Sequence, residues 1–188
     1  MSSKKKLVIS LSVAAAVLVA AIIAIVAVFA AAQQTVQSSF SIKFTATDVD
    51  CTVSGTWSLK DAGEGETGSL GSVVIAAKDT KGTHTMDADP VIPLTSEKNY
   101  VDLTYTFTNS GSRSFTIKST KAEVGEKLSM VFLDEDEESL DSVIVGEGVT
   151  CETTAVIIVR ITFDENAFNE DFTSAPITMA WDLAAVAA

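Results

Sequence analysis

Hydrophobic and polar residues alternate with a period of two in several runs after residue 38. The clearest runs are 40–46, 51–59, 101–108 and 177–183. In the first of them two phenylalanines and an isoleucine alternate with serine, lysine and threonine. Successive side chains of a strand point to opposite faces of a sheet, so this period predicts half-buried strands.

Other stretches predict strands without such regular alternation: 73–77, 84–86, 128–133 and 140–145. Residues 155–163 are apolar at nearly every position, which predicts a central strand with both faces covered. No convincing amphipathic helix follows residue 32. The pattern therefore predicts an all-β domain over 39–188, a jelly-roll or immunoglobulin-like sandwich of about 8–10 strands.

Glycine, proline and asparagine indicate where these strands end. Residues 61–72 contain four glycines and predict a loop, and 87–98 contain two prolines and predict an extended connection. Asn-Ser-Gly-Ser at 109–112 is strong turn chemistry. We therefore expect a hairpin that joins 101–108 to a return strand beginning at Phe115.

The N-terminal segment has a different pattern. Leu7 to Ala32 is an uncharged run directly after three lysines, and two serines are its only polar residues. As a helix it would be about 39 Å long, enough to cross a hydrocarbon core of about 30 Å. The lysines favour a cytoplasmic start, so the chain after Ala32 is expected outside the cytoplasm.

Two interpretations of this hydrophobic helix remain open. It is either a cleaved signal peptide, with small residues before Gln33, or an uncleaved membrane anchor, because its apolar run exceeds the usual length of about 7–15 residues. Residues 1–32 are thus a signal peptide or a transmembrane signal anchor, and 33–38 are a polar spacer. We expect an extracellular or cell-surface location, with membrane contact through 7–32 before or without cleavage.

Composition limits the classes of partner. The chain carries 13 basic and 25 acidic residues, for a net charge of −12, and three of the basic residues precede the leader. Such an acidic domain lacks the basic patches that nucleic-acid binding requires. We therefore expect no nucleic-acid partner.

The two cysteines of the chain, Cys51 and Cys151, lie at the starts of predicted strands. Outside the cell a disulfide between two strands is chemically allowed. Closing a loop of about 100 residues would stabilise the fold by up to about 4.7 kcal/mol in the chain-entropy model. Two unpaired thiols are the alternative.

Candidate catalytic and metal-binding residues are few. His84 is the single histidine, and its threonine-rich surroundings predict a surface residue. No H-E-x-x-H and no G-x-S-x-G occurs. No cofactor is expected apart from weak calcium candidates in acidic loops, namely Asp134, Asp136 and Asp164, and a solvated charge run is the favoured explanation of these loops.

Three segments together resemble a known family. They are SFSIKFTATDVDCTVSGTW (39–57), YVDLTYTFTNSGSRSFTIKS (100–119) and ETTAVIIVRITFDENAFNEDFTSAPITMAWD (152–182), and they follow a lysine-led apolar leader. This order resembles the TasA/camelysin group of exported proteins, which a SipW-type signal peptidase processes. The resemblance implies a jelly-roll fold and, for several members, polymerisation into extracellular fibres.

The resemblance also implies a mode of assembly, in which an N-terminal strand of one subunit completes the sheet of the next. Here that donor strand would be 39–47, with Phe40, Ile42 and Phe44 filling pockets of the neighbour. An ordinary first strand of a self-contained sandwich is the alternative. Some members of the group are described as metalloproteases, but this chain lacks the motif, so we predict no enzymatic activity.

The sequence and the resemblance therefore predict one of two functions. The first is an exported structural protein, a homopolymer subunit of fibres or a surface matrix that assembles by β-strand exchange. The second is a membrane-anchored extracellular β-sandwich module that binds a partner.

Overall fold

The computed structural model describes residues 34–37, 41–79, 83–86, 90–94, 97–124, 127–144, 146–164 and 177–187. The predicted leader and Phe40 lie outside these ranges. The chain divides into two compact units, Met1–Gln34 and Thr35–Ala188, and the second contains nearly all of the described residues. Within the described ranges, no helix is long and apolar enough to cross a membrane.

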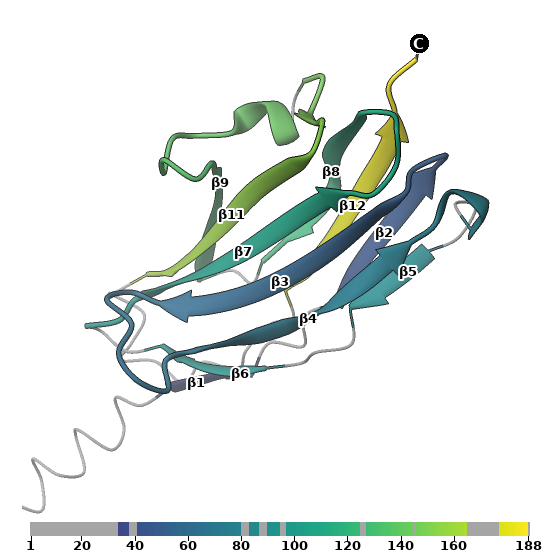
Figure 1. Ribbon diagram of the computed structural model, residues 1–188. Helices are drawn as coiled ribbons and strands as arrows, with labels where there is room; N and C mark the ends of the chain where they lie inside the picture. The colour runs from purple at the N-terminus through teal and green to yellow at the C-terminus, as the bar shows by residue number, and fades with distance from the viewer. Residues whose placement is uncertain are drawn as a thin grey trace, which may run out of the picture. The chain divides into compact units, whose positions relative to one another are not determined.

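The second unit is built almost entirely of strands, arranged in two five-stranded sheets (Figure 1). One sheet, here called the mixed sheet, has the order β10 (Val149–Cys151), β8 (Phe115–Glu123), β12 (Thr178–Ala185), β2 (Ser41–Thr47), β5 (Thr83–Met86). The other, here called the antiparallel sheet, has the order β4 (Thr67–Ile75), β3 (Cys51–Leu59), β7 (Tyr100–Asn109), β11 (Thr154–Phe163), β9 (Leu128–Leu133). The all-β prediction is confirmed.

Two short strands and two helical turns complete the described structure. Strands β1 (Gln34–Gln37) and β6 (Val91–Leu94) pair with each other. The 3-10 turns are η1 (Ala77–Asp79) and η2 (Asp141–Val143). Part of the predicted spacer 33–38 and of the predicted connection 87–98 is therefore strand, because the two segments satisfy each other's backbone groups.

The two sheets share one core, as expected of a sandwich-like fold. Trp181 of β12 lies at its centre, with ring centroids 5.5 Å from Tyr105 and 5.7 Å from Phe107, both on β7. Phe132 of β9 approaches the same indole at 5.9 Å. Aromatic pairs at such distances stabilise beyond the area they bury. The alternation predicted for these strands thus places their large side chains between the sheets.

The predicted hairpin at 109–112 is wrong. Strand β7 pairs with β3 and β11, whereas β8 pairs with β12 and β10, so the turn carries the chain from one sheet to the other. The N–H groups of Ser110 and Gly111 donate to the carbonyl of Asp50, at 2.8 and 3.1 Å. This backbone anchor fixes the turn across the end of the sandwich, and an alternating pattern cannot distinguish such an arch from a hairpin.

Two further predictions differ from the structure. Strand β4 begins at Thr67, inside the predicted loop 61–72, because glycines are accommodated in an edge strand whose register shifts at a bulge opposite Gly55. Residues 141–143 form η2 and not a strand. By contrast, the strand predicted at 155–163 is indeed interior, since β11 is paired on both sides.

Candidate assembly site

Strand β2, the predicted donor, lies inside the mixed sheet between β12 and β5. It runs parallel to β12, in a register from Ser41–Thr178 to Thr47–Ala184, and antiparallel to β5. The other pairs of the two large sheets described here are antiparallel. Strand β2 is thus held on both sides, and its departure would expose the full edge of β12.

The inward side chains of β2 are part of the core. Ile42, Phe44 and Ala46 are 2%, 0% and 1% exposed, while the alternate residues Lys43 and Thr45 face solvent. The ring of Phe44 meets Phe107 of the opposite sheet edge-on, at 6.3 Å between centroids. Ile42 and Phe44 therefore occupy the kind of buried positions that a donor strand fills, while Phe40 lies outside the described residues.

A short connection joins β2 to β3 in the opposite sheet. Asp48 adopts a φ of +52°, a left-handed conformation that non-glycine residues seldom take. Val49 is buried, and the carbonyl of Asp50 is held by the 110–111 turn described above. The chain thus takes a left-handed turn directly after β2 and is anchored two residues later, and we call this connection, residues 48–50, the hinge.

His84 lies beside this strand, on β5, in register with Phe44. Paired residues share a face of the sheet, so the imidazole points toward the core. Its Nε2 is buried and has no hydrogen-bond partner within the described part of the chain. His84 is therefore half-buried, with Nε2 inside, and the exposed threonines on either side of it mark the outer face of the same short strand.

The two cysteines lie in opposite sheets, and both are buried as free thiols. The Cys151 thiol donates to the carbonyl of Phe107, with 3.6 Å between sulfur and oxygen. Burial is the main cause that raises the pKa of Cys51 to about 12, and Cys151 and Asp50 raise it further. Burial also raises the pKa of Cys151.

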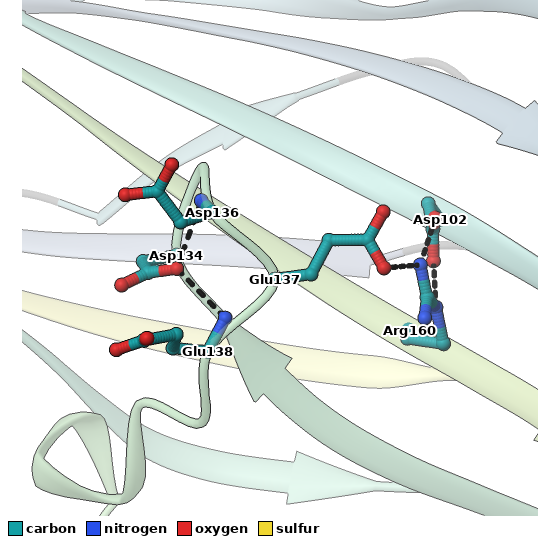
Figure 2. A network of polar contacts seen from close by, with 6 residues as sticks. All are labelled: Asp102, Asp134, Asp136, Glu137, Glu138 and Arg160. Atoms are coloured by element: carbon teal, nitrogen blue, oxygen red, sulfur yellow. Dashed lines mark hydrogen bonds and ion pairs between the residues drawn. The ribbon is translucent and has the colours of Figure 1, made fainter.

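Of the three calcium candidates, Asp134 and Asp136 share one turn, and Asp164 lies apart from them. Asp134 Oδ1 accepts the N–H groups of Asp136 and Glu138, at 2.9 and 2.8 Å, which closes a tight acidic turn (Figure 2). Asp164 follows β11 at the opposite end of β9, where its N–H donates to Lys127. Within the described ranges, no three histidine, cysteine or acidic side chains are grouped to hold a metal.

Sequence reasoning missed an ion-pair network on the outer face of the antiparallel sheet. Arg160 donates to both carboxylate oxygens of Asp102, at 2.8 Å each, and to Glu137 at 3.1 Å (Figure 2). Its guanidinium also stacks on Tyr100, at 4.3 Å from the ring centroid. The hydrogen bonds to Asp102 are the main cause that raises the pKa of Arg160, and the bond to Glu137 raises it further. A lone arginine in an otherwise apolar strand was the available signal.

No family model and no curated protein matched the sequence. The resemblance to the TasA/camelysin group therefore stays a prediction. The site combines strand β2 inside a sheet, its parallel partner β12 from the far end of the chain, and the hinge at 48–50.

Proposed function

We propose that this chain is an exported, non-enzymatic structural subunit that polymerises by exchange of β2 between copies. The domain would be a jelly-roll sandwich of the TasA/camelysin type, carried out of the cytoplasm by residues 1–32. The observation that carries the proposal is the placement of β2, an N-terminal strand that completes the mixed sheet beside β12.

Three features support exchange of this strand. Strands β1 and β2 precede the other strands of the domain, so once the β1–β6 pair separates, β2 can leave without threading the chain through itself. It is followed by the short hinge at 48–50, with Asp48 in a left-handed conformation, and short hinge loops favour domain swapping. The position it would vacate offers backbone hydrogen bonds and buried pockets, the two requirements of strand addition.

In an exchanged assembly, β2 of one copy would pair with β12 of the next copy in the register seen within one chain. Each subunit would donate one strand and accept one, which makes the contact heterologous and the assembly an open chain. The partner is therefore a second copy of this protein.

Cross-linking between differently substituted copies tests this proposal. Thr45 and Asp182 are registered partners across β2 and β12. A T45C chain mixed with a D182C chain during assembly should give covalent dimers that contain one of each, because exchange places Thr45 of one copy beside Asp182 of another.

The matched control uses a strand that does not exchange. Lys118 of β8 is registered with Asp182 on the other side of β12. A K118C chain mixed with a D182C chain should give no mixed dimer, because β8 and β12 stay in the same copy. Equal yields in both mixtures, or polymers with no T45C–D182C dimer, would refute exchange of β2.

The closed arrangement favours a second function, because β2 is already seated in its own sheet. In that case the protein is a membrane-anchored extracellular binding module, and the hydrophobic segment 7–32 stays attached. The mass of the protein isolated from its native surface separates the two, since a start near Gln33 supports the fibre subunit and an intact N-terminus supports the anchored module.

A further inference from the structure

The two cysteines occupy the same corner of the core, although they belong to different sheets. Cys51 begins β3 of the antiparallel sheet and Cys151 ends β10 of the mixed sheet. Both side chains are completely buried. They therefore point into the shared core from opposite sides.

Both cysteines lie against the same end of strand β7. The β3–β7 register places Cys51 directly opposite Asn109. The Cys151 thiol contacts the same part of β7, because it donates to the carbonyl of Phe107 and interacts with the backbone N–H of Asn109. Both sulfur atoms thus flank one short stretch of β7.

The chain beyond Cys151 is tied to the same place. The backbone N–H of Asn109 donates to the carbonyl of Thr153, and its side-chain amide donates to that of Glu152, each at 2.8 Å. The cross-strand partner of Cys51 therefore holds the two residues that follow Cys151. The Cys151 thiol also raises the pKa of Cys51 electrostatically, which is consistent with two cysteines that lie near each other.

We propose that Cys51 and Cys151 are joined by a disulfide bond in the exported protein, which cross-links the two sheets. The inference rests on the export that the proposed function includes, but not on strand exchange. At this corner the Cys151–Phe107 hydrogen bond already joins the two sheets, and the disulfide would add a covalent link across them.

The reaction needs an oxidant, and a protein disulfide of the oxidising compartment outside the cytoplasm supplies it. One cysteine thiolate attacks the oxidant's disulfide, forms a mixed disulfide and displaces one thiolate of the oxidant. The second cysteine then attacks the mixed disulfide, which forms the Cys51–Cys151 bond and releases the second thiolate. The chain loses two protons and two electrons, and the oxidant becomes a dithiol.

Burial sets the timing of this reaction. The thiolate is the attacking species, and both thiols are buried with raised pKa values. Oxidation is therefore expected while the chain folds after export, before the core closes around the two thiols. Once formed, the bond should resist reduction unless the domain unfolds.

The bond would also have a role in the proposed assembly. It links β3 to β10, and neither of these strands is β2. A domain whose β2 has left for a neighbour would thus retain a covalent connection between its two sheets while the β12 edge is open.

Peptide mapping of the full chain, isolated from its native surface and denatured in alkylating reagent without reductant, tests the bond. A peptide pair linked through Cys51 and Cys151, with no alkylated cysteine, is the expected result. Alkylation of both residues, or a bond from either cysteine to another chain, would overturn the proposal. This map uses the wild-type chain and does not require any variant to fold.

Thermal unfolding adds a second measurement. Reductant should lower the Tm of the wild-type protein by about 5–15 °C, given the usual effect of a disulfide in a domain of this size. A C51S/C151S variant should give the same Tm with and without reductant. The result is distinguishable from the exchange test, because mixed T45C–D182C dimers can form or fail to form whether or not the native bond exists.

Discussion

The two five-stranded sheets differ in the length of their edge strands and in the direction of their strand pairs. In the antiparallel sheet, the edge strands β4 and β9 have nine and six residues, and the interior strands β3, β7 and β11 have nine or ten. In the mixed sheet, the edge strands β5 and β10 have four and three residues. The mixed sheet also contains the parallel β2–β12 pair.

This difference indicates where the sandwich opens. Parallel pairs are slightly less stable per residue, and β2 is covered on one side by a strand of only four residues. The regions of lowest local stability open first under native conditions. We therefore expect β2 and β5 to separate from the domain before any strand of the antiparallel sheet.

The largest expected effect comes from Phe44, the fully buried residue at the centre of β2. F44A should lower the free energy of unfolding by about 3–5 kcal/mol, as for other buried phenylalanines. Hydrogen exchange should show faster amide exchange in β2 and β5, with β7 still protected. I157A, in β11, is the control and should accelerate exchange throughout, and an identical profile for both variants would remove the contrast between the sheets.

The hinge should give the next largest effect. Valine is β-branched and tolerates the left-handed conformation of Asp48 poorly, so D48V should destabilise the closed domain by about 1–2 kcal/mol. D48N is the control, because asparagine accepts this conformation. Denaturant unfolding measures the difference, and equal midpoints for D48V and D48N would show that the fold does not require a left-handed conformation at residue 48.

A smaller effect is expected on the outer face of the antiparallel sheet. Arg160 and Asp102 are about one-fifth exposed, and lysine cannot reproduce the two parallel hydrogen bonds or the stacking on Tyr100. R160K should therefore lower stability by about 1 kcal/mol, measured by denaturant unfolding. Its yield of T45C–D182C dimers should be unchanged, since the network does not touch β2, and a reduced yield would link the two sheets functionally.

The smallest effect concerns acid pH. The hydrogen bond that Lys98 donates is the main cause that lowers the pKa of Glu66 below its ordinary value of 4.5. The hydrogen bond from the N–H of Gly63 lowers this pKa further. A carboxylate with a lowered pKa stabilises the fold above its unfolded pKa, and this contribution is lost as the pH falls through its folded pKa. The free energy of unfolding of E66Q should thus be slightly lower than that of wild type at neutral pH and equal to it in strong acid. A difference in unfolding free energy that grows as the pH falls would contradict this expectation.

Much of the fold could be predicted because it depends on local pattern. Burial of alternate residues in β2, β7 and β12 follows directly from the period of two, and β3 and β9 have the predicted bounds. The assignment of strands to sheets could not be predicted, since the turn after Asn109 has the same chemistry in a hairpin and in an arch. Only the anchor on Asp50, distant in sequence, distinguishes them.

Local pattern also predicted part of the candidate site. Alternation identified Ile42 and Phe44 as inward residues of the first strand, but nothing local indicates that the strand lies parallel to β12. The position of His84 likewise depends on its partner, because its own strand is too short to show which face is buried. The ion pair of Asp102 and Arg160 depends on the β7–β11 register, which the sequence alone does not fix.

The parallel β2–β12 pair has a consequence for the order in which the chain folds. In the proposed export, β2 emerges outside the cytoplasm early, whereas its partner β12 follows only after about 130 further residues. Closing so long a loop is slow compared with forming neighbouring pairs. During that interval, β2 of the incomplete copy has no partner within its own chain. At high local concentration it can pair with the open β12 edge of another copy before its own β12 emerges.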